Sequence, residues 1–195
     1  MEELIYPEDI APTVPPVSVS NRDTDIRGAE WFPVVEPSGL VTGRATRLYC
    51  HSGAKPLHPV VHLHVMDRFG RLYLQKRSVK KDIQPGKWDT AVGGHVDYGE
   101  GIIEALYREA SEELGFSEFN PVHIVTYVFE SDVEKELVNV FAAVGSFSLF
   151  PDKDEVEEGR YWELKEIEEN FGKSVFTPNF EQEFARIRNA ITALL

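Results

Sequence analysis

One acidic stretch constrains this chain more than any other, the run from Gly93 to Phe116, GGHVDYGEGIIEALYREASEELGF. Apolar residues recur in it at positions 102, 103, 106, 110 and 114. That spacing predicts a helix over Glu100–Leu114 with one buried side. Gly115 is a natural helix end. Two glycines therefore lead through a loop into a helix whose other side carries acidic residues.

Three of these acidic residues, Glu109, Glu112 and Glu113, are spaced so that they share one helix face. Like charges at this spacing destabilise a helix unless a partner neutralises them. Mg²⁺ is such a partner, because it prefers oxygen ligands. Arg108 can pair with Glu104 or Glu112, each one turn away. The alternative is a solvated acidic face, since the chain has 33 acidic residues.

The wider spacing separates these two interpretations. From Gly94 the order is glycine, five residues, Glu100, seven residues, Arg108-Glu109, an apolar residue, one residue, Glu112-Glu113, one residue, Gly115 and an apolar residue. Chance agreement with so many fixed residue types is on the order of 10⁻⁹ per start position. The stretch is identified as a Nudix box, and the chain resembles Nudix hydrolases from about Glu30 to Leu195.

The resemblance implies a Nudix fold, an α/β/α sandwich with a mixed β-sheet, and hydrolysis of a diphosphate linkage with Mg²⁺ or Mn²⁺. It also implies roles for single residues. The metal ligands would be Glu109, Glu112, Glu113 and the carbonyl of Gly94, Arg108 would orient a ligand carboxylate, and Glu100 would support the loop. The general base stays open between Glu112, Glu113 and a glutamate outside the box, for which Glu155, Glu157 and Glu158 are candidates in a loop.

Three further segments are similar to type I isopentenyl diphosphate isomerases: CHSGAKPLHPVVHLHV, LYLQKRSVKKDIQPGKWDTAVGGHVDYGE and EKELVNVFAA. Taken singly, their histidines and glutamates read as ordinary loop and strand residues. Together they suit a divalent transition metal. The resemblance implies a second metal site with the ligands His51, His58, His95, Glu134 and Glu136. His62 and His64 alternate with apolar residues on a strand, so we expect them to be sheet residues.

One departure from the isomerases decides the expected reaction. They have a catalytic cysteine where this chain has Gly93, which has no side chain to move a proton, and Cys50 does not match that position. The isomerases also break the helix pattern that this chain keeps. Both points favour hydrolysis of a nucleoside diphosphate derivative or related compound. The alternatives are an isomerase-type enzyme and a non-catalytic nucleotide sensor.

Two basic residues, Arg77 and Lys81, match positions that contact the diphosphate in the similar isomerases. A guanidinium fork suits phosphate oxygens. The alternative interpretation is that they simply end a surface strand.

The rest of the sequence mixes strands and helices. Residues 1–28 contain four prolines and no sustained period, which predicts an extended N-terminal arm before a domain at 29–195. Expected strands are a hairpin within 30–47 with its turn at 37–39, then 60–66, 71–77, 88–92, 123–130, 137–150 and 160–164. Expected helices are 165–170 and a last one that Thr177 caps and Pro178 opens, with a stripe of Phe180, Phe184, Ile187 and Ile191.

The composition limits the classes of binding partner and the cellular compartment that we expect. The formal net charge of -13 disfavours nucleic-acid polymers but allows a small phosphorylated substrate whose charge bound cations offset. A single cysteine fits a reducing compartment, and no apolar run is long enough for a membrane span, so we expect a cytoplasmic protein. The oligomeric state stays open, although the arm could exchange onto a second copy to give a homodimer.

Overall fold

The computed structural model describes residues 3–6, 29–80, 84–153 and 156–195. Lys81, Glu155 and all but four residues of the expected arm lie outside them. The chain forms two compact units, each assembled from three segments. The first unit comprises Met1–Val61, Gly94–Ala105 and Thr126–Asn139, and the second comprises His62–Gly93, Leu106–Val125 and Val140–Leu195.

The first unit contains the expected hairpin, β1 (Trp31–Val35) and β2 (Val41–Thr46), in antiparallel pairing. The reversal between them contains Gly39, whose φ of 83° favours glycine. A short helix, α1 (Arg47–Cys50), follows β2 and begins where the Thr46 side chain accepts a hydrogen bond from the Tyr49 amide. No sequence pattern predicted α1, because a helix of four residues is too short to show a hydrophobic period.

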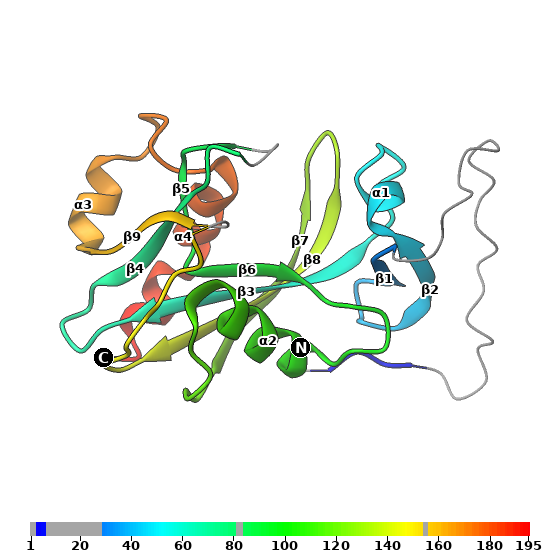
Figure 1. The fold of residues 1–195 in the computed structure, drawn as a ribbon, viewed down its shortest axis with the longest axis horizontal. Coiled ribbons are helices and arrows are strands. Elements are labelled where there is room, and N and C mark those ends of the chain that lie inside the picture. The colour runs from blue at the N-terminus through cyan, green and yellow to red at the C-terminus, as the bar shows by residue number, and fades with distance from the viewer. Residues whose placement is uncertain (1–2, 7–28, 81–83, 154–155) are drawn as a thin grey trace. The chain divides into compact units, whose positions relative to one another are not determined.

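The second unit is built around β4 (Leu72–Arg77), which pairs antiparallel with β9 (Val156–Trp162) on one side and β5 (Trp88–Asp89) on the other (Figure 1). Helices α3 (Leu164–Glu169) and α4 (Pro178–Thr192) follow β9. The Thr177 hydroxyl accepts a hydrogen bond from the Phe180 amide at 3.1 Å, as a capping residue does. The expected stripe of α4 is buried at all four positions.

The larger sheet has seven strands in the order β5-β4-β3-β8-β7, with β6 paired to β3 and β9 paired to β4. The remaining members are β3 (His58–Met66), β6 (Val92–His95), β7 (Val122–Glu130) and β8 (Lys135–Val144). The helix of the acidic stretch is α2 (Ile102–Leu114), and Gly115 follows it with a φ of 64°. The predicted α/β class with a mixed sheet is confirmed.

Three sequence predictions were wrong in detail. The strand expected at 88–92 is two strands, β5 and β6, and Gly93 lies inside β6 rather than after it. The strand expected at 137–150 ends at Val144. Glu157 and Glu158 lie in β9 rather than in a loop, because the register of β9 on β4 extends as far as Val156. Among the described residues, no helix is both long and apolar enough to cross a membrane.

Candidate functional site

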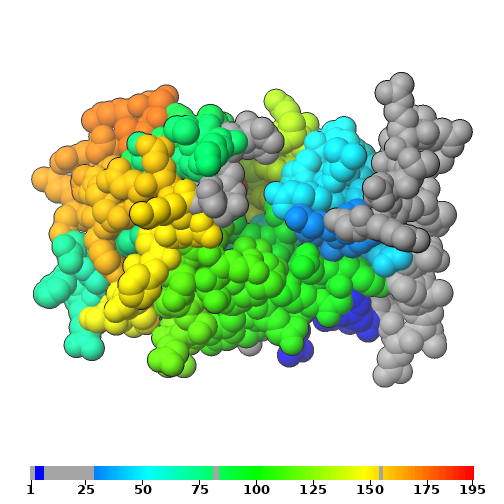
Figure 2. Space-filling model, in the orientation of Figure 1, coloured from blue at the N-terminus to red at the C-terminus, as the bar shows by residue number. Residues whose placement is uncertain are grey.

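The acidic face of α2 is the first candidate site. Figure 2 shows the green part of the chain, which includes α2, on the near face of the molecule. The opposite side is buried through Leu106, Ala110 and Leu114, which are fully inaccessible. Burial of that stripe fixes the rotation of the helix, so the glutamates at 109, 112 and 113 are directed away from the core. The helix therefore presents carboxylate oxygens, the donor type that a hard divalent cation requires.

Two donors hold these carboxylates. Nη1 of Arg108 lies 2.7 Å from Oε1 of Glu109 and 3.2 Å from Oε2 of Glu112. Nε2 of Gln75, on β4, donates to Oε2 of Glu113 at 2.9 Å. Side-chain exposure rises from 14% at Glu109 to 60% at Glu112, so the set runs from a sheltered to a solvent-facing carboxylate. The expected pairing of Arg108 with Glu112 is present, whereas Glu104 accepts from the Gly101 amide at 2.9 Å.

No sequence pattern pointed to Gln75. It is 7% exposed and lies in a strand whose first four residues are all buried. Only the packing of β4 beside α2 reveals its contact with Glu113. A buried amide that donates to a carboxylate orients that carboxylate.

The loop before α2 belongs to the first unit and has its own support. Oε2 of Glu100 accepts a hydrogen bond from the Asp97 amide at 3.0 Å, the kind of contact expected of a loop-supporting residue. Gly99 has a φ of 93°, which a side chain would strain. Gly94 lies in β6, two positions after Val92, where its carbonyl belongs to the strand.

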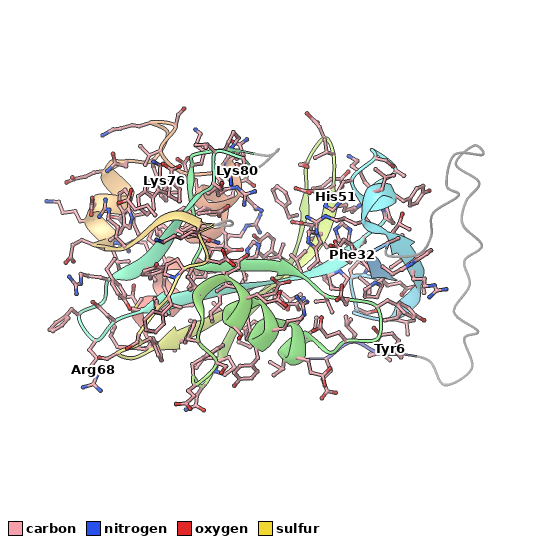
Figure 3. All side chains as sticks on the ribbon, viewed as in Figure 1. Tyr6, Phe32, His51, Arg68, Lys76 and Lys80 are labelled. Carbon is pink, nitrogen blue, oxygen red and sulfur yellow. The ribbon has the colours of Figure 1, made fainter. Side chains whose placement is uncertain are left out.

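Three histidines of the first unit form the second candidate site. His51 ends α1, His58 begins β3 and His95 ends β6. One ring nitrogen of each lies within 4.8 Å of the other two, and among the described residues this is the one such convergence of three potential ligands. The ring of Phe32 stacks on His95 at 4.4 Å between centroids, and Figure 3 shows Phe32 beside His51.

The hydrogen bonds of two of these histidines suit metal binding. Nδ1 of His51 lies 2.8 Å from the Arg47 carbonyl, and Nδ1 of His58 lies 2.9 Å from the Pro56 carbonyl. Each Nδ1–H therefore donates to a carbonyl, and in a neutral His58 ring this leaves Nε2 as the nitrogen that offers a lone pair. Nε2 of His58 is buried and has no hydrogen-bond partner within the described ranges. Such an atom is the one a metal ion would satisfy.

The expected glutamates stand next to this cluster. Oε2 of Glu134 lies 3.3 Å from Nε2 of His51, and Oε1 of Glu136 lies 4.0 Å from Nε2 of His95. The hydrogen bond to Glu134 raises the pKa of His51, whereas burial lowers the pKa of His58. All five residues that the resemblance brought together from distant segments are thus neighbours within one unit. Their nitrogen and carboxylate donors fit a divalent transition metal.

Arg77 has a partner that the sequence did not indicate. Its Nη1 lies 3.5 Å from Oδ2 of Asp89, the register neighbour of Gln75 on β5. Burial raises the pKa of Asp89, and the charge of Arg77 opposes that shift. Arg77 is therefore one member of a charge pair within the second unit, and a phosphate bound there would compete with Asp89 for it.

The side chains of Cys50 and Glu157 pack against or pair with residues that are not candidate ligands. Cys50 is fully buried with Phe32 and Ala45, and burial raises the pKa of its thiol to about 12. A thiol that stays protonated is a poor nucleophile. Oε1 of Glu157 lies 3.2 Å from Nζ of Lys76, so this carboxylate is paired on the surface of β4 and β9.

A buried network of the second unit was also unforeseen. Glu183 of α4 is 1% exposed and lies 2.7 Å from Nδ1 of His62 and 2.7 Å from Nε2 of His64. The two histidines are sheet residues, as expected, and their shared face is what brings both to one carboxylate. Glu183 carried no signal because a glutamate in a polar helix usually faces solvent.

Comparison with known proteins settles the family. A model of the NUDIX domain matches residues 56–180. The chain belongs to the NUDIX family. An isopentenyl-diphosphate Delta-isomerase from Streptomyces griseus is 28% identical over 189 residues, which cover 94% of this chain and 96% of the relative. A protein from Yersinia pestis named an uncharacterized Nudix hydrolase is 32% identical over 130 residues, 65% of this chain and 71% of the relative.

The fold agrees with the family. The crystal structure of DR0079 from Deinococcus radiodurans superposes with a TM-score of 0.70 and covers 80% of this chain and 98% of its own. At 20% identity this likeness concerns the fold. The NUDIX fold expected from the acidic stretch is thus confirmed, and the similarity to isopentenyl diphosphate isomerases is confirmed with it.

Proposed function

We propose that this NUDIX protein hydrolyses a diphosphate linkage in a nucleoside diphosphate derivative or a related compound. The observation that carries the proposal is the carboxylate face of α2, where Arg108 and Gln75 position glutamates that an inactive copy has no need to keep. The intact spacing of the box supports it. A sensor would need to bind a nucleotide but not to orient these carboxylates.

The roles are those that the resemblance to Nudix hydrolases implies. Glu109, Glu112 and Glu113, with the carbonyl of Gly94, would hold Mg²⁺ or Mn²⁺. The cation supplies charge neutralisation at the diphosphate and a more acidic water. Arg108 orients Glu109 and Glu112, and Gln75 holds Glu113. Glu112 or Glu113 takes the proton of the attacking water. Arg77 and Lys81 would contact the phosphate oxygens, with Arg77 leaving Asp89 to do so.

An isomerase-type enzyme is the second candidate. The histidine cluster with Glu134 and Glu136 favours it, as does the name of the Streptomyces relative. Gly93 disfavours it, because no side chain at that position can move a proton. In a hydrolase the cluster would serve as a second metal site. Its buried Nε2 of His58 fits such a role in either enzyme.

A panel assay separates these functions. The full chain is incubated with Mg²⁺ or Mn²⁺ and a set of nucleoside diphosphate derivatives, and phosphate products are measured. A parallel sample receives isopentenyl diphosphate, and its isomer is followed by proton NMR. Cleavage of at least one derivative without isomer formation supports hydrolysis. Isomer formation would replace the proposal, and tight binding of one nucleotide without turnover would establish the sensor.

Location and assembly are part of the proposal. A cytoplasmic protein fits the single cysteine and its burial. A homodimer through the N-terminal arm remains a prediction, checked by light scattering of the full chain and of a chain that begins at residue 29.

A further inference from the structure

The edge of the His62 ring lies beside the position that Gly93 leaves without a side chain. A Cβ built on Gly93 would meet Cδ2 of His62 at 3.5 Å and Nε2 at 3.6 Å. These are ordinary contact distances, so a side chain there is not excluded by space. Gly93 also lacks the positive φ that would require glycine. The imidazole therefore packs against the backbone of Gly93 at a position where neither the space nor the backbone conformation requires glycine.

Glu183 fixes the orientation of that imidazole. Its Oε2 accepts from Nδ1 of His62 at 2.7 Å, so the other ring nitrogen, Nε2, is turned toward strand β6 and Gly93. A carboxylate on one nitrogen of an imidazole sets the tautomer and stabilises the protonated ring. The side chain of His62 is 13% exposed, whereas Glu183 is 1% exposed. The His62 ring thus contacts the buried Glu183 carboxylate on one side and is itself partly accessible to solvent.

The positive charge that balances the Glu183 carboxylate is better accommodated on the ring of His62 than on that of His64. Burial opposes the ionisation of Glu183, but the charges and hydrogen bonds of the two histidines outweigh it and hold the pKa of Glu183 below its ordinary value. A buried carboxylate needs a cation beside it. His64 has a buried Nδ1 without a hydrogen-bond partner among the described residues, where an added N–H would be unsatisfied. His62 is therefore the better place for the balancing proton.

The surroundings of His62 are also charged. Asp89 of β5 interacts electrostatically with both Arg77 and His62, and Asp89 is the register neighbour of Gln75, which holds Glu113. Glu183 from α4 and Asp89 from β5 thus interact with His62, while His64 from β3 shares Glu183 and Arg77 interacts with Asp89. The network and the glutamate face of α2 are linked through one strand pair of the second unit.

We propose that His62 is a protonated residue of the diphosphate site, which donates its Nε2 proton to the leaving group from beside Gly93. The proposal rests on the proposed hydrolysis. The oxygen of water forms a bond to one phosphorus, and the bond from that phosphorus to the leaving oxygen breaks. The electron pair of that bond stays on the leaving oxygen, which takes the proton of His62. The proton of water passes to a glutamate of α2, and solvent returns a proton to His62.

The first test replaces the imidazole but keeps a donor to Glu183. His62→Gln can still donate to the carboxylate, whereas it cannot titrate near neutral pH. We expect the turnover of a derivative that the wild type cleaves to fall about 100-fold at pH 7. The decline of the wild-type rate at high pH, which deprotonation of His62 causes, should be absent. His123→Gln is the matched control, because His123 of β7 packs on Phe141 of β8 and has no assigned role.

The second test measures the protonation of the His62 ring by nitrogen NMR of the full chain, with its histidines labelled with ¹⁵N. We expect His62 to be protonated on both nitrogens at pH 7, and its Nε2 resonance to shift when Mg²⁺ and pyrophosphate are added. Glu183→Gln should lower the pH at which His62 loses its proton. Thermal unfolding of each variant shows whether it is folded, and Glu118→Gln, an exposed change, supplies the reference.

The outcomes separate this inference from the proposed function. An active wild type whose His62→Gln variant keeps its rate and pH profile would overturn the role of His62 while hydrolysis stands. If the wild type cleaves no derivative, both the proposed hydrolysis and the proposed proton donation by His62 are refuted. The resonance of His62 then decides whether the residue belongs to a diphosphate site at all. No shift with Mg²⁺ and pyrophosphate would exclude it.

Discussion

The side-chain amide of Gln75 donates a hydrogen bond of 2.9 Å to Oε2 of Glu113 and so ties β4 to the carboxylate face of α2. The contact gives Glu113 a fixed direction that a glutamate on an open helix surface lacks. It also joins Glu113 to the strand pair that carries Asp89. The proposed metal site is therefore supported from the sheet as well as from within the helix.

Replacing Gln75 tests this support. Gln75→Leu removes the donor but keeps an apolar stem of similar length, so Glu113 loses its orientation while the sheet stays filled. We expect the Mg²⁺ concentration that gives half-maximal turnover to rise about tenfold, the lower end for loss of a residue that orients a ligand. A magnesium titration of the rate measures it. Gln182→Leu, an exposed change on α4, is the control, and equal titrations for both variants would refute the role of Gln75.

The buried Glu183 makes stability depend on pH in acid. Its folded pKa is below the unfolded value, so its contribution is present above an unfolded pKa of about 4.3 and is lost as the pH falls toward the folded pKa. The free energy of unfolding of the wild type should therefore fall more steeply below about pH 4.3 than that of Glu183→Gln. Urea titrations between pH 3 and 7 measure both slopes. Parallel curves would show that Glu183 is not held as an anion.

Removing Glu183 at neutral pH should be costly. Glu183→Ala leaves His62 and His64 without their shared acceptor inside the core. Breaking a buried charge pair on one side costs about 3–5 kcal/mol. Chemical unfolding at pH 7 measures the loss, with Glu118→Ala as the exposed control. A loss below about 1 kcal/mol would mean that the network contributes little to the fold.

The histidine cluster predicts a transition-metal site. Burial lowers the pKa of His58, so its ring is neutral at pH 7 and its buried Nε2 can bind without losing a proton. We expect His58→Ala to bind one fewer equivalent of Mn²⁺ or Zn²⁺ than the wild type, measured by calorimetry and metal analysis after dialysis. His123→Ala should bind as the wild type does. Equal stoichiometry for all three proteins would remove the second site.

The sequence predicted best those features that depend on residues close together in the chain. The buried stripe of α2, its end at Gly115 and the capping of α4 by Thr177 each depend on a few neighbouring residues, and each was predicted correctly. The five members of the histidine cluster came from a resemblance, since nothing local joins His51 to Glu136. Contacts made by tertiary packing were missed. Gln75 on Glu113, Arg77 on Asp89 and Glu183 on two histidines each join residues far apart in the chain.

The most direct test of the account is the Mg²⁺-dependent release of phosphate products from nucleoside diphosphate derivatives by the wild type, Glu112→Gln and Glu113→Gln. We expect cleavage by the wild type and a loss of at least 100-fold in each variant, because each removes a carboxylate that serves as ligand or base. The melting temperatures should stay close to the wild type, since neither residue is in the core. Unchanged rates in both folded variants would contradict the metal-binding role of α2.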